Sequence, residues 1–224
     1  MEDITIIIPT KDREEKLSRK IEQINTKTDF RLLIANGTGN NTPFIKRIHE
    51  QTKKTDSKYI MLMSDDDVYY IDGIKKCVRF LEKNKDYSSA QGRWESFNGE
   101  YPCYITQRTL DQKLDTRFIS MQNNYFIMLY SVFRADVFKE VIKKSLEFCN
   151  IYPEKYQGIL LEYMFAYIGL IRGKHKSINR LYCSKVYGEN LNFFGKMHKL
   201  AEKGYYKFRY SDYSFNKHEY NKIL

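Results

Sequence analysis

Residues 59–74 of the chain read YIMLMSDDDVYYIDGI. The apolar run at 59–63 is typical of a buried strand. It is followed, after one serine, by three consecutive aspartates, Asp65, Asp66 and Asp67. Three negative charges in a chain that is basic overall need a chemical reason, and the segments around them indicate the fold that presents them.

The segments on either side alternate between strand and helix patterns. Residues 3–9, DITIIIP, form a short β-branched run that ends in proline, which predicts a buried strand. Leu17, Ile21 and Ile24 recur at helical spacing and predict a helix over 13–26. By the same criteria we expect a strand at 30–39, a helix at 43–52, a strand at 58–64 and a helix at 71–84.

Strands and helices that alternate through such short connections predict a parallel sheet with right-handed crossovers. In open sheets of this kind, ligands bind at the carboxyl ends of the strands. Residues 10–13, 36–41 and 65–70 follow three of the predicted strands, so we expect them to line one edge of the sheet. The acidic triplet is therefore placed where such a sheet presents a ligand.

The second half of the chain has weaker patterns. We expect strands at 87–97, 100–107 and 123–133, a hairpin turn at Asn98-Gly99, helices at 135–149 and 157–172, and a strand at 176–187. The sequence shows no repeat and no flexible linker. It predicts one compact α/β unit, with a Rossmann-like, mostly parallel sheet at 1–95. A less regular half follows at 96–224 and ends in a basic, aromatic segment.

The composition narrows the class of protein. The chain has 224 residues, 42% of them hydrophobic and 29% charged, as in soluble globular proteins. No run approaches the roughly 18 to 20 apolar residues of a membrane span, and the first residues lack a signal-peptide pattern. Four widely spaced cysteines, without a CxxC pair, argue against a zinc site and for reduced thiols. We therefore expect a cytoplasmic protein.

The acidic triplet has two interpretations. It could be a solvated turn in which an aspartate caps the next helix. Against this, adjacent carboxylates repel one another unless a cation compensates, and oxygen ligands in an open loop suit Mg²⁺ or Mn²⁺. A metal held there would neutralise charge on a departing diphosphate. The net charge of +10 fits phosphorylated small molecules, polyanions or an anionic membrane face equally well.

Three segments together resemble family 2 of the GT-A glycosyltransferases: ITIIIPTKDREEKL at 4–17, FRLLIANGTG at 30–39 and KYIMLMSDDDV at 58–68. Members of that family begin with a strand ending in Pro-Thr and carry an Asp-x-Asp motif after a later strand. The resemblance covers roughly residues 3–95 and rests on order and spacing. It implies a GT-A fold with a nucleotide-sugar-binding half at 1–95 and an acceptor-binding half at 96–224.

The resemblance also implies an activity. The expected enzyme is a metal-dependent glycosyltransferase, inverting, that moves a sugar from a nucleoside-diphosphate sugar to a glycan or lipid-linked acceptor, as in polysaccharide biosynthesis. Its cofactor would be Mn²⁺ or Mg²⁺. A peripheral contact at the inner face of a membrane is a further expectation.

By position, the resemblance places Pro9, Thr10, Lys11 and Arg13 along the donor-nucleotide pocket. Members usually have an acidic pair after the second strand, whose aspartate meets the nucleobase. Here Asn36 stands in that region, and its amide could hydrogen-bond a base edge. This departure leaves the base of the donor open.

The same resemblance gives roles to the acidic triplet. Asp65 would lie near the ribose and the metal, Asp66 would belong to the donor-nucleotide site, and Asp67 would ligate the metal directly.

The second half offers one candidate for the base that deprotonates the acceptor hydroxyl. Glu162 interrupts an apolar helix pattern and shares a stripe with Gly158, Ala166 and Gly169, which would leave room for a substrate. The alternative is that Glu162 forms a structural ion pair and the small residues admit a neighbouring backbone. The remaining candidate acids are Asp111, Asp115 and Asp136.

Other side chains carry weaker signals. His175 and His198 are candidates for a further metal ligand, although each could equally be a surface residue. Trp94 could stack on a sugar, but a core position is the more common role of a tryptophan in such a run.

Two other functions remain open on the sequence alone. The first is a basic nucleic-acid-binding module, suggested by the aromatic and basic tail at 204–224. That tail has only four Lys or Arg against two Asp or Glu, and the acidic triplet would repel a phosphate backbone, so nucleic acid is not the expected partner. The second is a nucleotidyltransferase, which would normally need a glycine-rich phosphate loop that TKDREEK does not provide.

The segment at 190–204 predicts a basic amphipathic helix. Such a helix binds a membrane surface or packs on the core of its own protein, and we favour packing.

Overall fold

The computed structural model describes residues 3–25, 28–39, 42–98, 101–105, 108–123, 125–149, 151 and 154–186. Inter-residue contacts divide the chain into Met1–Tyr187 and Gly188–Leu224, and every described residue lies in the first part. The helix predicted at 190–204, the tail and His198 lie outside the described residues. Among the described residues, no helix combines the length and the apolarity that crossing a bilayer requires.

The first part of the chain has the predicted alternation. Its elements are β1 Ile4–Thr10, α1 Glu14–Asn25, β2 Arg31–Asn36, α2 Phe44–Thr52, β3 Tyr59–Leu62, β4 Val68–Tyr69 and α3 Ile71–Lys83. Only the two-residue strand β4 was not expected. The apolar patterns predicted the other elements because the helices carry their apolar residues at helical spacing, whereas β1 and β3 are short apolar runs buried on both faces.

The second part of the chain contains β5 Tyr87–Asn98, β6 Tyr101–Ile105, α4 Leu114–Asn123, β7 Val132–Arg134, α5 Ala135–Cys149, α6 Glu154–Arg172 and β8 Lys174–Val186. The predicted hairpin is confirmed in its pairing, because β5 and β6 are antiparallel with Asn98 opposite Tyr101. The turn residues 99 and 100 lie outside the described residues.

The strand predicted at 123–133 is wrong over most of its length. Its first residue ends α4, which the sequence did not predict, and only Val132 and Phe133 enter β7. Phe126 and Met128 are nevertheless buried, because they pack into the core from a loop rather than from a strand. A turn in which the backbone N–H of Ser131 donates to the carbonyl of Met128 precedes β7.

A single sheet runs through the described chain in the order β2-β1-β3-β7-β5-β8-β4, and β6 pairs with β5 outside this path. β1 is parallel to β2 and to β3, and β5 is parallel to β8. β7 and β4 run antiparallel to their neighbours. The sheet continues across residue 95. That residues 1–95 bind the nucleotide-sugar and residues 96–224 bind the acceptor stays a prediction.

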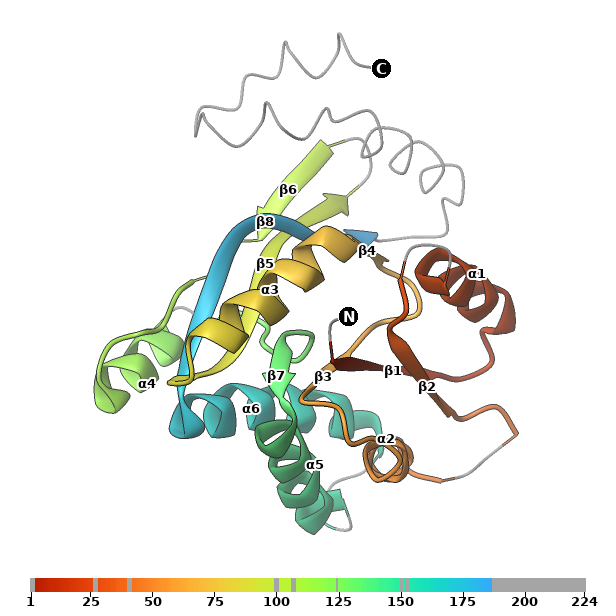
Figure 1. The fold of residues 1–224 in the computed structure, drawn as a ribbon. Coiled ribbons are helices and arrows are strands. Elements are labelled where there is room, and N and C mark those ends of the chain that lie inside the picture. The colour runs from red at the N-terminus through yellow and green to blue at the C-terminus, as the bar shows by residue number, and fades with distance from the viewer. Residues whose placement is uncertain are drawn as a thin grey trace, which may run out of the picture. The chain divides into compact units, whose positions relative to one another are not determined.

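Helices cover both faces of the sheet, as Figure 1 shows. On one face, Ile7, Ile60 and Leu62 pack with the apolar sides of α2, α5 and α6. On the other face, Ile6 and Met61 pack with α1 and α3. Successive residues of each central strand therefore point into two different cores, which explains why those strands are apolar at almost every position.

The strand register brings the predicted ligand-binding segments together. Thr10, the last residue of β1, pairs with Asn36, the last residue of β2. β3 lies on the other side of β1, with Ile7 opposite Leu62. The loops that follow β1, β2 and β3 consequently leave the sheet at the same edge, as the sequence predicts.

Candidate functional site

The acidic triplet forms the loop between β3 and β4. The side chains of Asp65 and Asp67 are almost completely buried, at 6% and 3% exposure, and Asp66 is partly exposed. This degree of burial excludes the simple solvated turn, because ionised carboxylates are rarely buried unless they are compensated.

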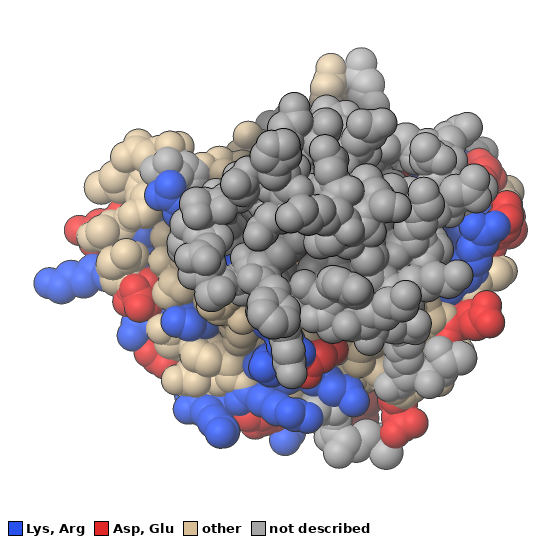
Figure 2. Space-filling view, turned by 90° about the horizontal axis from the view of Figure 1, so that it is seen from above, with Lys and Arg blue, Asp and Glu red and all other residues tan. Residues whose placement is uncertain are grey.

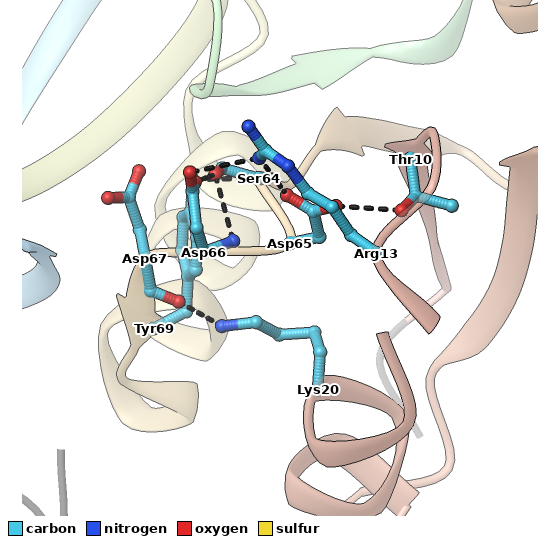
Figure 3. Close-up of polar contacts among 8 residues, drawn as sticks. All are labelled: Thr10, Arg13, Lys20, Ser64, Asp65, Asp66, Asp67 and Tyr69. Carbon is cyan, nitrogen blue, oxygen red and sulfur yellow. Dashed lines mark hydrogen bonds and ion pairs between the residues drawn. The ribbon is translucent and has the colours of Figure 1, made fainter. Parts of the chain in front are cut away.

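Asp65 is held by the segment that follows β1. Its Oδ2 accepts a hydrogen bond from Thr10 Oγ1 at 2.7 Å, and its Oδ1 accepts one from Arg13 Nη1 at 3.0 Å (Figure 3). The family resemblance predicts these three residues for one site, and the structure brings them into direct contact across 55 and 52 residues of sequence separation.

Asp66 shares the same arginine. Arg13 Nη1 lies 3.1 Å from its Oδ2, and Ser64 Oγ donates to its Oδ1. Burial alone would raise the pKa of Asp66. The Ser64 hydrogen bond and the positive charges of Arg13 and Lys16 outweigh burial, so that the pKa of Asp66 lies below its ordinary value.

Asp67 is anchored by a residue that the sequence analysis did not select. The ammonium group of Lys20, on α1, donates to the backbone carbonyl of Asp67 (Figure 3). Lys20 is only 4% exposed, and its Nζ lies 5.4 Å from the centroid of the Tyr69 ring. Burial lowers the pKa of Lys20, whereas the negative charges of the nearby aspartates oppose this shift. Figure 3 shows the Asp67 carboxylate directed away from the Arg13 contacts.

A signal for Lys20 does exist in the sequence. Lys20 stands three residues after Leu17 and four before Ile24, so it shares the buried face of α1 with both. A lysine on the apolar face of a helix is a candidate for a buried charge, which needs a negatively charged partner. The acidic triplet is a candidate for that partner.

The site offers ligands that suit Mg²⁺ or Mn²⁺. The carboxylates of Asp65 and Asp67 supply hard oxygens, and such ions are commonly held by one or two carboxylates together with substrate phosphates. Within the described residues, no group of three or more His, Cys, Asp or Glu side chains is close enough to hold a metal alone. Two carboxylates fit a metal whose remaining ligands would come from a phosphorylated ligand.

His175 is not part of this set. It lies near the start of β8, where its Nδ1 is 2.8 Å from Ser89 Oγ, and it is completely buried. The acidic loop leads into β4, and β4 pairs with Ser184 and Cys183 near the other end of β8. Nine residues of strand separate His175 from Ser184, which is on the order of 30 Å.

The loops after β1 and β2 are joined by hydrogen bonds. Asn36 Oδ1 accepts from the backbone N–H of Thr38 at 2.9 Å, and Thr38 Oγ1 accepts from the backbone N–H of Asp12 at 2.8 Å. Asp12 itself has a φ of 54°, which directs the chain back toward the second loop. Of the other predicted pocket residues, Pro9 is partly buried and Lys11 is exposed.

Glu162 lies on α6 with a partly exposed side chain. Its Oε1 accepts a hydrogen bond from the hydroxyl of Tyr125 at 2.7 Å, from the loop before β7. Among the neighbouring small residues, Gly158 has open space where a Cβ would stand, whereas Gly169 packs against Phe133. The predicted stripe of small residues therefore divides into an open end near Glu162 and a packed end in the core.

Tyr130, in the loop before β7, is a second tyrosine of this region. Burial raises the pKa of Tyr130, and the negative charges of Asp67, Asp66 and Glu162 raise it further. The backbone carbonyl of Tyr130 is fixed by the hydroxyl of Tyr182 at 2.7 Å. Tyr125 and Tyr130 were not among the predicted site residues, because the pattern of their segment predicts a strand.

The remaining candidates have other surroundings. Trp94 is fully buried, with its ring 5.6 Å from that of Tyr130, so it is a core aromatic and not a sugar platform. Asp136 forms an ion pair with Arg172 at 3.3 Å. Asp111 and Asp115 are exposed, and Asp115 Oδ1 accepts from the backbone N–H of Thr116 near the start of α4.

Comparisons with known proteins agree with this architecture. The crystal structure of S. aureus TarS matches 99% of this chain and 42% of its own, with a TM-score of 0.57 and 13% sequence identity. A TarS 1–349 structure in complex with UDP-GlcNAc matches 99% of this chain and 70% of its own, with a TM-score of 0.56 and 13% identity. The complex of TarS 1–349 with UDP gives a TM-score of 0.54 at 11% identity, over 99% of this chain and 69% of its own.

At these identities the structural matches establish the fold, and this chain spans less than half of the TarS chain. No curated protein sequence matches the chain. A family model described as "Glycosyl transferase family 2" matches residues 28–142, which is just over half of the 224 residues and includes the acidic loop. With the predicted motif order and the GT-A type of fold, this match shows that the chain belongs to glycosyl transferase family 2.

Proposed function

We propose that this protein transfers a sugar, with inversion, from a nucleoside-diphosphate sugar to a hydroxyl group of a glycan or lipid-linked acceptor, with the help of Mn²⁺ or Mg²⁺. The observation that carries the proposal is the contact of Thr10 and Arg13 with Asp65. It joins the end of the first strand to an acidic loop at the ligand-binding edge of the sheet.

The donor side follows from that contact. Asp65 and Asp67 would hold the metal, which when bound offsets negative charge on the departing diphosphate. Arg13 is half-exposed, with 48% of its side chain accessible, so its guanidinium can contact a phosphate while it orients Asp65 and Asp66. Asn36 and the loop after β2 lie beside Thr10, where a base or ribose would be recognised.

The acceptor side is assigned to Glu162. As the general base it would take the proton from the attacking hydroxyl while the donor bond breaks on the opposite face. Tyr125 donates to one of its oxygens and thereby orients the carboxylate. Because burial and the Glu162 charge both raise the pKa of Tyr125, its hydroxyl keeps its proton and remains a donor at neutral pH.

Calorimetry of nucleotide binding tests the donor side directly. UDP and GDP would be titrated into the protein with Mn²⁺ and with a chelator, in wild type and in Asp67→Ala. We expect much tighter binding with Mn²⁺ in the wild type and loss of this metal effect in Asp67→Ala. Equal affinity with and without Mn²⁺ would falsify the metal role.

The proposal extends to the acceptor and to the place in the cell where the enzyme acts. We place the protein in the cytoplasm, with a lipid-linked acceptor approached at the inner face of a membrane. Cys77 is a free, buried cysteine, which is compatible with a reducing compartment.

A further inference from the structure

A row of aromatic rings lies on the described surface next to Glu162. The ring centroids of Tyr125 and Tyr163 are 5.2 Å apart, and those of Tyr163 and Tyr167 are 6.2 Å apart. The row ends at Phe118, whose ring is 5.6 Å from that of Tyr167. The planes of Tyr163 and Tyr167 differ by 12°, and those of Phe118 and Tyr167 by 18°. The row thus links the loop before β7, α6 and α4 through contacts between neighbouring rings.

Packing of the core accounts for Phe118, which lies against the core cluster, but not for the exposed rings of the row. The inner side of α6 packs into the core through fully buried residues that include Leu161, Phe165 and Leu170. The outer side leaves Tyr163 44% exposed, and Tyr125 facing it is 38% exposed. A helix that buries one apolar side normally carries charged and polar residues on the other. Here the exposed side combines the aromatic residues Tyr156 and Tyr163 with Ile159 and Ile171.

The charge near the row differs from that of the chain as a whole. Among its described side chains, α6 carries only Glu162 and Arg172 as charged groups, and Arg172 is paired with Asp136 and Glu140. The charged residues of α4 are Asp115 and a largely buried Arg117. On the face that Figure 2 presents, Lys and Arg are interspersed with Asp and Glu among the described residues. A nucleic acid or an anionic membrane would need cations at the row, whereas an uncharged ligand would not.

Tyr125 links the row to the chemistry. Its hydroxyl donates to Glu162, and its ring contacts Tyr163, so the row begins at the proposed general base. We infer that the row Tyr125–Tyr163–Tyr167–Phe118 binds the uncharged saccharide part of the acceptor, with a sugar hydroxyl reaching Glu162. The inference rests on the proposed function. The C–H groups on the face of a pyranose match the negative face of an aromatic ring, and the tyrosine hydroxyls can bond sugar hydroxyls.

Saccharide binding can be measured without donor or metal. Chito-, malto- and cello-oligosaccharides would be titrated into wild type, Tyr163→Ala, Tyr163→Phe and the control Phe148→Ala, with NMR shifts or calorimetry as the readout. Phe148 is an exposed aromatic on α5 outside the row. We expect at least one of these saccharides to bind wild type and Phe148→Ala alike. Tyr163→Ala should weaken binding about three- to tenfold, and Tyr163→Phe should restore most of it.

Several results would overturn the inference. The first is that none of the three saccharide classes binds, and the second is that Tyr163→Ala binds them as tightly as wild type. The third is that the row instead mediates self-association or binding to phosphatidylcholine vesicles, and that Tyr163→Ala abolishes it. Circular dichroism of each variant confirms that the fold is retained. Metal-dependent UDP and GDP binding, measured on the same samples, separates the two proposals. If metal-dependent nucleotide binding persists while saccharides fail to bind, only the assignment of the row is wrong. If saccharides bind but metal-dependent nucleotide binding is absent, the proposed donor function is wrong.

Discussion

Lys20 donates a hydrogen bond from its buried ammonium group to the backbone carbonyl of Asp67. This contact ties α1 to the acidic loop and brings the Lys20 ammonium group near the three aspartates, whose negative charges oppose the lowering of its pKa by burial. Unpaired charges are costly to bury, so the lysine and the aspartates are best understood as one compensated group. The metal-free loop is then stabilised by a cation that belongs to the chain itself.

Replacing this cation should make the loop depend more strongly on metal. Lys20→Met keeps the length and the apolar contacts of the side chain but removes its charge. We expect a lower melting temperature without metal, and a larger rise on adding Mn²⁺ than in wild type, because the metal then compensates carboxylates that repel one another. Thermal unfolding with and without Mn²⁺ measures both effects.

The exposed Lys16, on the same helix, provides a matched control. Lys16→Met removes a charge of the same sign near Asp66 without removing a buried hydrogen bond. It should change the Mn²⁺ response little, because exposed charges are screened. Identical Mn²⁺ shifts in Lys20→Met and wild type would show that Lys20 does not compensate the triplet.

Glu162→Gln separates catalysis from donor binding. The amide keeps the shape of the side chain but cannot accept a proton, so turnover should fall on the order of 10²- to 10⁴-fold. The affinity for the donor nucleotide, measured by calorimetry, should be unchanged. Tyr125→Phe, which removes only the hydrogen bond to Glu162, should reduce turnover by a smaller factor. Turnover that survives Glu162→Gln would assign the base to another acid.

Local patterns were sufficient for the first half of the fold. The strands β1, β2 and β3 and the helices between them were predicted from periodicity, because each buries residues that its own segment specifies. The contact of Thr10 and Arg13 with Asp65 could also be anticipated, since the ends of neighbouring parallel strands meet at one edge.

Tertiary packing determines the parts of the fold that the local sequence patterns do not predict. Phe126 and Met128 belong to an apolar run that resembles a strand, but they fill the core from a loop, and only the end of the run pairs in the sheet. The helix α4 has a weak apolar pattern, and its Arg117 is buried against the carbonyl of Leu170 at 2.8 Å. Such contacts depend on elements far away in sequence and leave no local signal.

Gly37 should tolerate a side chain only if Arg47 moves. A Cβ at Gly37 would lie 2.7 Å from Cζ of Arg47 and 2.8 Å from one terminal nitrogen. That guanidinium is buried and donates to the carbonyl of Thr42 at 2.6 Å. We expect Gly37→Ala to destabilise the protein by about 1–3 kcal/mol, as in overpacked sites. In an Arg47→Ala background the same change should cost much less, because the overlap is gone.

Chemical denaturation of the two single variants and the double variant measures this coupling. Additive losses would mean that the two side chains do not compete for the same space. UDP and GDP binding by Gly37→Ala would also show whether the loop after β2, which lies beside Thr10, contributes to the donor site.

His175 should make the protein less stable in mild acid. Its ring is completely buried, with Ser89 at Nδ1 and the ring of Phe126 5.3 Å away, so no charged partner is seen among these neighbours. Burial lowers the pKa of His175 from 6.5 to about 3. Between these two values the unfolded chain binds a proton that the folded chain excludes. The contribution of the neutral His175 ring to the free energy of unfolding should therefore be fully present above pH 6.5. Below pH 6.5 the free energy of unfolding should fall by about 1.4 kcal/mol per pH unit.

Denaturant unfolding at pH 7 and pH 5 tests this dependence, because most carboxylates remain ionised at both values. His175→Phe should lose most of the difference between the two pH values, whatever its absolute stability, since it has no group to protonate. His49→Gln is the matched control: burial and Lys53 also lower the pKa of His49, but its ring is only partly buried, so most of the pH dependence should remain. If His175→Phe and wild type lose the same free energy between pH 7 and pH 5, the acid sensitivity has another origin.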